Sequence, residues 1–239
     1  MPQPLVSAVL VTRRPCFVAD ILGMMAAQSY APLEVVLVLH GHTADDLPPE
    51  AREACGRQGV RLVLAPAELT LGECLNRGIA VSHGEVVTKV DDDDIYGPGY
   101  LAEAMEAFLA GKGDVIGKAE QYVYLTATRE LLLRLPGWSQ DGGHRYVAGG
   151  TLLMPRRLAL DPGFEPIPRR VDTTFLHACP AIGARIYATS RRHFVRRRFD
   201  NDHHTWRPDE ALFRSESVTV RRDVVDDSPA GLIRLVSGR

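Results

Sequence analysis

Hydrophobic and polar residues alternate in blocks along the first ninety residues, and the blocks have the lengths of strands and helices. Continuous apolar runs of strand length occupy 5–11, 34–39, 60–65 and 85–90. Unbroken hydrophobicity of this length is typical of parallel strands that are buried on both faces. Because polar or amphipathic segments of helix length separate the runs, the pattern predicts an α/β fold with a mostly parallel central sheet flanked by helices.

Specific residues mark the expected helix ends. Pro15 suits the first turn of a helix, because its fixed φ is already helical. Thr70 and Glu73 fit a capping box, and with Gly84 they delimit another helix. A proline start and a glycine stop predict a further helix over 98–113.

The second half of the chain is less regular. Strand-like segments are expected within 114–128 and at 148–155, 184–189 and 193–199, and a Gly-rich loop at 136–147. A helix is expected to begin near Asp172. Since neither a Pro/Gly/Ser-rich linker nor an internal repeat interrupts the sequence, it predicts a single domain.

Composition narrows the function classes. The chain is 45% hydrophobic and 24% charged, as in ordinary soluble globular proteins, and its net charge of −2 argues against a nucleic-acid-binding protein. The four cysteines have no zinc-ligand spacing, and we find no secretory signal and no membrane span. We therefore expect reduced thiols and a cytoplasmic location.

Four aspartates, Asp91 to Asp94, follow the fourth predicted strand. Ligands of open α/β sheets bind beyond the carboxyl ends of the strands, where this cluster is expected. Adjacent carboxylates repel one another unless a cation offsets their charge, and such oxygens suit Mg²⁺ or Mn²⁺. The alternative is a solvated acidic turn, but the position favours a metal site.

Two further segments could contact an anionic ligand. Thr12 and Arg13 end the first strand, where a hydroxyl, a guanidinium and a helix N-terminus come together, although an ordinary polar loop would look the same. Asn76 and Arg77 lie late in a predicted helix, where a basic residue also complements the helix dipole.

Chemistry-bearing residues in the second half also have two interpretations each. Gly149 and Gly150 could admit a ligand close to the backbone or mark a bulge. Asp172 could cap a helix or act as a general base. The histidine pair in "DNDHHTW" could bind a metal or lie on a surface loop, and the basic stretch 191–199 could face phosphates or form a solvated sheet edge.

Together these segments resemble a family 2 glycosyltransferase of the GT-A fold. The matching motifs are "VTRRP", "LNRGIAVSHGEVVTKVDDDDIYGPGYL", "AGGTLLMP", "RRVDTTFL" and "HHTW", in this order. The central block is the most specific, because it combines the helix, the small-residue turn, the strand and the Asp cluster. The resemblance implies one GT-A domain, with a nucleotide-sugar-binding half at 1–97 and an acceptor-binding half with a C-terminal extension at 98–239.

The resemblance also implies roles for individual residues. The family's Asp-x-Asp motif falls on Asp91 to Asp93, which makes Asp93 the chief ligand of Mg²⁺ or Mn²⁺ and places Asp91 or Asp92 nearer the donor ribose or sugar. Asp91 is a second candidate ligand, and His204 matches a histidine that completes the metal site in some relatives. Asp172 matches the general base of inverting members.

The donor is expected to be a nucleotide-diphosphate sugar. Its expected contacts are Thr12, Arg13, Asn76, Arg77, Asp91, Asp92, Gly149, Gly150 and Thr151. Where many relatives carry an acidic residue that meets the nucleotide base, this chain has His40 and Gly41, with Asp45 as a substitute in the next loop. The identity of the nucleotide base therefore stays open. So do the acceptor, which could be a glycan, a lipid-linked or a small molecule, and the oligomeric state, for which a homodimer is one option.

Two other functions compete with the transferase. A Mg²⁺-dependent phosphohydrolase would use the first aspartate as a nucleophile, but such enzymes usually carry the motif on the first strand, and here three strands precede it. The other is a non-catalytic nucleotide-sugar-binding protein on the same fold. Candidates for every catalytic part are present, which favours the enzyme.

Overall fold

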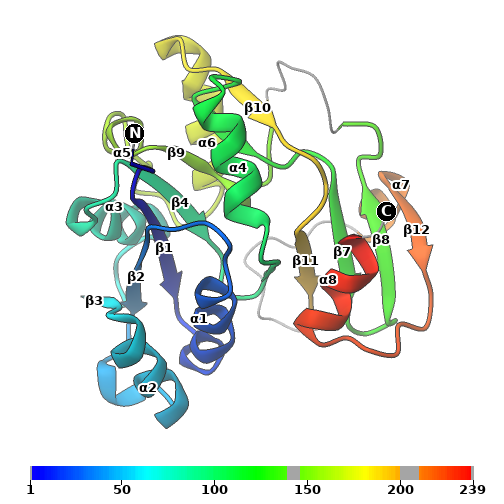
Figure 1. The fold of residues 1–239 in the computed structure, drawn as a ribbon, viewed down its shortest axis with the longest axis horizontal. Helices are drawn as coiled ribbons and strands as arrows, with labels where there is room; N and C mark the ends of the chain where they lie inside the picture. Colours follow the sequence, from blue (N-terminus) through cyan, green and yellow to red (C-terminus); the bar gives the residue numbers. More distant parts are fainter. Residues whose placement is uncertain (1, 139–145, 200–209, 238–239) are drawn as a thin grey trace.

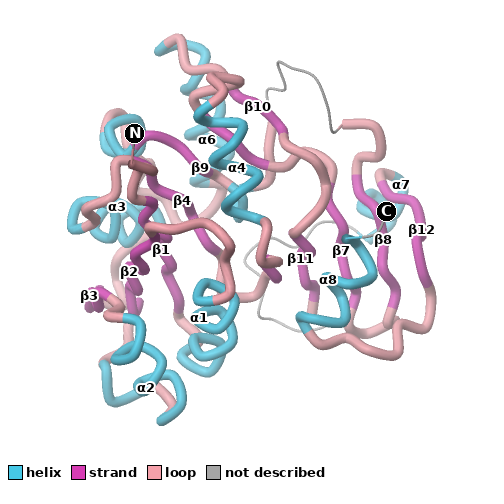
Figure 2. The backbone as a smooth tube through the Cα atoms, in the orientation of Figure 1, coloured by secondary structure: helices cyan, strands magenta, loops and turns pink. Residues whose placement is uncertain are grey.

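A computed structural model describes residues 2–138, 146–199 and 210–237 (Figures 1 and 2). Its strands are β1 (Val6–Thr12), β2 (Leu33–His40), β3 (Arg61–Ala65), β4 (Val86–Val90), β5 (Ile95–Tyr96), β6 (Val115–Gly117), β7 (Gln121–Leu125), β8 (Glu130–Arg134), β9 (Leu153–Pro155), β10 (Ile186–Ala188), β11 (Phe194–Arg198) and β12 (Ser217–Arg221). Its α-helices are α1 (Val18–Ala26), α2 (Pro49–Gln58), α3 (Leu71–Val81), α4 (Tyr100–Leu109), α5 (Arg156–Leu160), α6 (Val171–Ala178), α7 (Glu210–Ser215) and α8 (Pro229–Ser237).

The first sheet is the mostly parallel sheet that the apolar runs predict. Among the described residues it has the strand order β10-β6-β9-β4-β1-β2-β3, in which β1 pairs in parallel with both β2 and β4. Only β9 runs antiparallel to its neighbours β4 and β6. The order places the end of β4 in the middle of the sheet, beside the end of β1.

Helices cover both faces of this sheet, because alternate residues of its strands are apolar on opposite sides. On β1, Ala8 and Leu10 pack in a core cluster with side chains of α1, α2 and α4. Val9 faces the other way and packs with side chains of α3, α5 and α6. The predicted fold class, a single α/β domain with a central sheet flanked by helices, is confirmed.

A second, five-stranded sheet with the order β12-β8-β7-β11-β5 lies beside the first (Figure 1). Strand β5 follows the Asp cluster directly and pairs antiparallel with β11, which pairs in parallel with β7. The basic stretch that contains β11 is therefore an inner strand, and the alternative of a solvated sheet edge is wrong.

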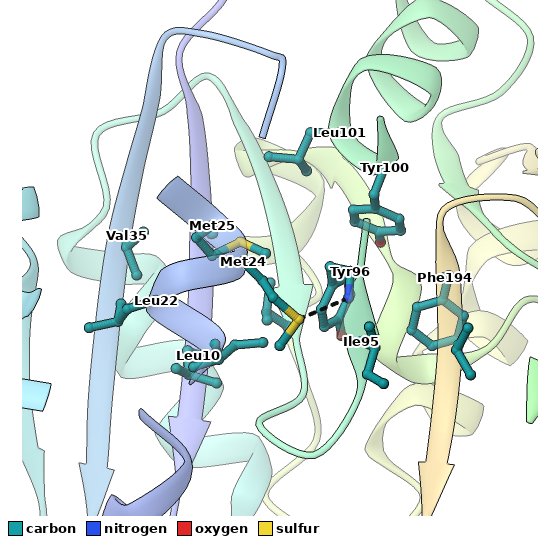
Figure 3. Close-up of a cluster of buried hydrophobic side chains, with 14 of the residues drawn as sticks. Leu10, Leu22, Met24, Met25, Val35, Ile95, Tyr96, Tyr100, Leu101 and Phe194 are labelled. Carbon is teal, nitrogen blue, oxygen red and sulfur yellow. Dashed lines mark hydrogen bonds between the residues drawn. The ribbon is translucent and has the colours of Figure 1, made fainter. Parts of the chain in front are cut away.

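The core cluster continues from the first sheet into the second (Figure 3). Tyr96 lies between the two sheets, with its ring 4.9 Å from that of Tyr100 and 5.4 Å from that of Phe194. Its backbone N–H donates to the sulfur of Met24 on α1, at 3.4 Å. One continuous core therefore fixes the end of β4 relative to β11.

Several predicted elements differ in detail. The strand expected at 148–155 is limited to β9, because Gly149–Thr151 form a short 3-10 turn. Pro15 opens a similar turn just before α1. Asp172 is not a helix cap, since it is the second residue of α6, and the cap position is held by Arg170 in a left-handed conformation with φ 64°.

Candidate active site

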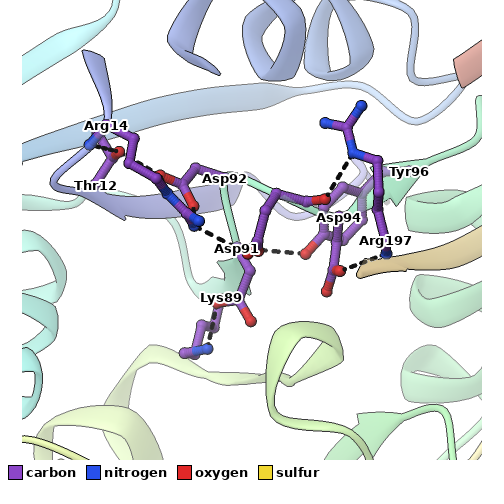
Figure 4. A network of polar contacts seen from close by, with 9 residues as sticks. Thr12, Arg14, Lys89, Asp91, Asp92, Asp94, Tyr96 and Arg197 are labelled. Carbon is purple, nitrogen blue, oxygen red and sulfur yellow. Dashed lines mark hydrogen bonds and ion pairs between the residues drawn. The ribbon is translucent and has the colours of Figure 1, made fainter. Parts of the chain in front are cut away.

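The four aspartates lie between β4 and β5, at the carboxyl end of the parallel sheet (Figure 4). They are not an open acidic loop, because Asp92 and Asp94 are buried, at 4% and 3% exposure. Asp91 and Asp93 keep more of their side chains accessible, 35% and 14%. Each of the four carboxylates has different cationic and hydroxyl neighbours, so each can have a different chemical role.

Asp92 is held by the loop that follows β1. Its carboxylate accepts a hydrogen bond from the Thr12 hydroxyl and is bound by the guanidinium of Arg14, whose Nε donates at 3.1 Å. Burial raises the pKa of Asp92, and the contacts from Arg14 and Thr12 oppose the rise. Asp92 thus fastens the first βα loop to the Asp cluster.

Asp93 and Asp94 face β11 and Arg14. The Asp93 carboxylate lies 3.0 Å from Arg14 Nη2, and its carbonyl accepts a hydrogen bond from Arg197 Nε at 3.2 Å. Asp94 accepts from the backbone N–H of Arg197 at 3.2 Å, and burial, followed by the charge of Asp93, raises its pKa well above the usual value. Asp94, which follows β4 of the first sheet, therefore contacts β11 of the second sheet.

Asp91 lies beside Lys89, which also contacts Asp172. Lys89 Nζ lies 2.5 Å from Asp91 Oδ1 and 3.4 Å from Asp172 Oδ1. Burial, followed by the charge of Asp91, raises the pKa of Asp172, while the Lys89 ammonium opposes the rise. The candidate general base is thus brought to the acidic cluster from α6, some eighty residues along the chain.

Glycine is required at two positions beside these carboxylates. A Cβ on Gly149 would lie 2.0 Å from Asp172 Oδ2, and one on Gly150 would lie 2.7 Å from Asp91 Oδ2 and 2.9 Å from Asp94 Oδ2. These separations are shorter than any real carbon–oxygen contact. The glycine pair therefore lets three carboxylates approach one short stretch of backbone.

The same stretch is fixed by neutral hydrogen bonds. The Tyr96 hydroxyl accepts from the backbone N–H of Asp91 at 2.9 Å and donates to the Gly150 carbonyl at 2.7 Å. The Thr151 hydroxyl donates to the Ala148 carbonyl at 2.7 Å. Of the predicted donor residues, Gly149 and Gly150 thus lie against Asp172 and Asp91, whereas the Thr151 hydroxyl is engaged with the backbone of Ala148 and Lys118.

Arg13 lies beside His40, where the sequence lacks the acidic residue of many relatives. Its Nε donates to His40 Nδ1 at 3.1 Å, and its Nη2 donates to the Ala67 carbonyl at 2.8 Å. Burial, together with the charge of Arg13, lowers the pKa of His40. A neutral imidazole held by a guanidinium therefore occupies the end of β2.

Asn76 is engaged with a distant loop. Its Nδ2 donates to the Phe164 carbonyl at 2.8 Å, and its Oδ1 accepts from the Phe164 N–H at 2.9 Å. Arg77, next to it on α3, is exposed. Among the described residues, no hydrogen bond or ion pair joins Asn76 or Arg77 to the Asp cluster, and their expected contact with the donor stays a prediction.

Replacing Asn76 by Ala is expected to destabilise the fold, because the buried backbone of Phe164 would lose two partners. We expect the free energy of unfolding in urea to fall by about 1–3 kcal/mol, the usual cost of unsatisfied buried polar groups. Arg77→Ala is the matched control from the exposed face of the same helix, with an expected change within about 0.5 kcal/mol. Equal stability of the two variants would contradict the assigned role of Asn76.

The structure adds residues that the sequence did not single out. Lys89, Arg14 and Arg197 contact the Asp cluster directly. Lys89 carries a visible signal, since it is the one charged residue inside an otherwise uncharged strand, whereas nothing distinguishes Arg14 from its neighbour Arg13 in the sequence. His204, the third candidate metal ligand, lies outside the described residues.

The chain matches the model of a known family, described as glycosyl transferase family 2, over residues 9–160. The match covers more than half of the chain and includes the end of β1, the Asp cluster and the glycine pair. The protein belongs to glycosyl transferase family 2. No curated protein sequence matches it significantly.

Solved structures agree with this family in fold. S. aureus TarS 1-349 matches with a TM-score of 0.63 and 19% identity, covering 80% of this chain and 60% of that one. The mannosyltransferase of Pyrobaculum calidifontis, in complex with GDP-Man and Mn²⁺, matches with a TM-score of 0.65 and 17% identity, covering 90% and 63%. The family 2 chain thus spans less than two thirds of the length of these neighbours, whose likeness establishes the GT-A type of fold.

No helix in the described part of the chain combines the length and the hydrophobicity that a membrane span requires.

Proposed function

We propose that this family 2 protein is a glycosyltransferase that moves a sugar from a nucleotide-diphosphate sugar to an acceptor hydroxyl, with inversion at the anomeric carbon. The observation that carries the proposal is the placement of Asp172 beside the strand-end Asp cluster, where the ammonium group of Lys89 lies near both Asp91 and Asp172. A carboxylate of raised pKa beside a ligand site is suited to general-base catalysis. Residues 1–97 would bind the donor and residues 98–239 the acceptor.

The donor would lie over the ends of β1 and β4. Thr12 and Arg13 would contact the nucleotide, Asp91 and Asp92 the ribose or sugar, and Gly149 to Thr151 the junction with the acceptor. The contacts of Asp92 with Thr12 and Arg14 would place its carboxylate in the wall of that site. Asn76 and Arg77 would act from α3, Asn76 through the loop that it holds at Phe164. Solved relatives support a nucleotide-sugar donor, since their complexes contain UDP-GlcNAc or GDP-Man.

A divalent cation fits the chemistry of the donor set. Asp91 and Asp93 present partly exposed carboxylates, and Mg²⁺ or Mn²⁺ commonly uses one or two carboxylates together with substrate phosphates and water. Within the described residues, no three His, Cys, Asp or Glu side chains converge to form a complete metal site. Asp93 would be the chief ligand, with Asp91 and His204 as further ligands. The bound cation would stabilise negative charge on the departing diphosphate.

Asp172 would perform the proton transfer. Its carboxylate would take the proton of the acceptor hydroxyl while that oxygen forms a bond to the anomeric carbon. The bond between this carbon and the diphosphate oxygen would break, and the nucleoside diphosphate would leave with the electron pair. Attack opposite the leaving group inverts the configuration of the sugar. The acceptor would be a glycan, a lipid-linked or a small molecule, and the reaction would take place in the cytoplasm.

The direct test uses UDP-GlcNAc and GDP-mannose as donors and water as a substitute acceptor. We expect one of the two to raise the melting temperature in the presence of Mn²⁺, and to release UDP or GDP slowly. Removal of the metal with EDTA should abolish both effects. Binding without any release would favour the non-catalytic sugar-nucleotide-binding protein, and the absence of binding to either donor would contradict the proposal.

A further inference from the structure

A lysine lies inside the central sheet, between the two carboxylates to which the mechanism gives separate roles. Lys89 is on β4, which is buried along its whole length, and the Lys89 side chain is 5% exposed. Burying an ammonium group is costly unless carboxylates compensate for it. Here Asp91 and Asp172 do so, and they raise the pKa of Lys89 against the effect of burial.

The two contacts of Lys89 differ in length, which suggests that Asp91 anchors Lys89 and that Lys89 in turn acts on Asp172. Its Nζ lies 2.5 Å from Asp91 Oδ1, in the loop directly after β4, and 3.4 Å from Asp172 Oδ1, which belongs to α6. Among the described residues, Lys89 makes the one ion pair of Asp172. The short contact fixes the ammonium group, and the longer one lets it attract the carboxylate of α6.

The two oxygens of Asp172 therefore have different surroundings. Oδ1 faces Lys89 inside the protein, whereas Oδ2 lies against Gly149, where a side chain would not fit. Within the described residues, Oδ1 is buried and accepts no hydrogen bond, so the ion pair with Lys89 is the contact that favours this orientation of the carboxylate. The start of α6 does not orient the Asp172 carboxylate in this way, because its cap residue Arg170 makes no side-chain cap hydrogen bond.

We propose that Lys89 is a positioning residue of the transfer reaction: anchored on Asp91, it holds Asp172 so that one carboxylate oxygen faces the acceptor hydroxyl. The inference rests on the proposed function, because it takes Asp172 as the general base. It deepens that function by giving Lys89 a part that is separate from donor binding. A base displaced by about 1 Å can lose roughly a hundredfold in rate, so such a residue affects turnover more than affinity.

The experiment is a double-mutant cycle on the hydrolysis of UDP-GlcNAc or GDP-mannose with Mn²⁺. We expect Lys89→Met to lower kcat about a hundredfold while the donor KM stays within about threefold. Lys89→Arg keeps a cation for both carboxylates, so its kcat should be at least about tenfold higher than that of Lys89→Met. In the Asp172→Asn background, Lys89→Met should change kcat by less than about threefold, because the two residues act as one unit.

Lys118→Met is the matched control for loss of a buried lysine. Lys118 is 1% exposed, and its Nζ binds Glu103 Oε2 at 2.7 Å and the Ser190 carbonyl at 2.7 Å, in a network that contains neither Lys89 nor Asp172. We expect Lys118→Met to lower the melting temperature as Lys89→Met does, but to leave kcat unchanged well below that temperature.

Three outcomes would overturn the proposal. If Lys89→Met still lowered kcat about a hundredfold in the Asp172→Asn background, Lys89 would act on something other than Asp172. A donor KM that rises in proportion while kcat stays constant would make Lys89 a donor-binding residue only. Both results would leave the transferase function standing. A wild-type protein that binds and hydrolyses neither donor would instead overturn the function, and this inference with it.

Discussion

Replacing Asp172 by Asn is expected to lower the turnover of nucleotide-sugar hydrolysis by roughly 10²–10⁴-fold, the usual contribution of a general base. The amide has nearly the same shape, so α6 and its contact with Gly149 should persist, but it cannot take a proton. The donor dissociation constant, measured by calorimetry with Mn²⁺, should stay within about threefold of wild type, since the base acts on the acceptor.

The pH profile offers an independent check of the same residue. Burial raises the pKa of Asp172, so its carboxylate should become protonated at a higher pH than an ordinary aspartate. Wild-type kcat should therefore fall as the pH is lowered through this raised pKa, and Asp172→Asn should lack that acid limb. Full activity of Asp172→Asn would exclude the residue as the base and leave it a structural role on α6.

Asp93→Ala should abolish the metal dependence of donor binding. We expect the donor dissociation constant with Mn²⁺ to rise at least about tenfold, equivalent to about 1.4 kcal/mol, and to approach the value measured with EDTA. The fold should tolerate the change, since Arg14 loses the Asp93 carboxylate but keeps Asp92, and the carbonyl contact of Asp93 with Arg197 does not involve the side chain.

Two controls separate the loss of a metal ligand from the loss of a buried carboxylate and of a surface carboxylate. Asp92→Ala removes the buried partner of Thr12 and Arg14, so it should lower the melting temperature whether or not metal is present. Asp20→Ala, on the exposed face of α1, should change neither stability nor binding. If Asp93→Ala bound the donor with unchanged metal dependence, Asp93 would not be a ligand.

Local rules predicted the parts of the fold that are made locally. The capping box of Thr70 and Glu73 is present, with both reciprocal hydrogen bonds, at the start of α3. Gly59 ends α2 in the left-handed conformation that its position suggests. The buried parallel strands follow from uninterrupted apolar runs, because both of their faces must be covered.

Pairing between distant segments was the part that the sequence could not supply. Strand β11 pairs with β7, although some seventy residues separate them, and no hydrophobic period encodes such a partner. The strand expected at 148–155 was shortened because Gly149 and Gly150 bend the chain around the carboxylates of Asp91 and Asp172. At this position the packing of carboxylates against the backbone overrides the local sequence pattern.

The candidate site was anticipated in its acidic members and missed in its basic ones. Asp91 and Asp172 could be proposed from a strand end and a motif order, because the ends of parallel strands meet at one edge of a sheet. Lys89 is marked in the sequence as the one charged residue of its strand, but its contact with Asp172 could not be inferred, since that contact depends on where α6 docks. Arg14 and Arg197 could not be inferred either. They reach the Asp cluster from opposite sides, through contacts that depend on how distant segments pack.

The ring cluster of Tyr96, Tyr100 and Phe194 has a consequence for how the chain can be divided. Tyr96 belongs to the first 97 residues, whereas Tyr100 and Phe194 belong to the rest, yet all three are at most 1% exposed in one core. A fragment cut between residues 97 and 98 would leave these rings in water. The two parts on either side of this cut, which we propose to bind the donor and the acceptor, are therefore not exchangeable modules, and neither part can change its ring packing without a matching change in the other.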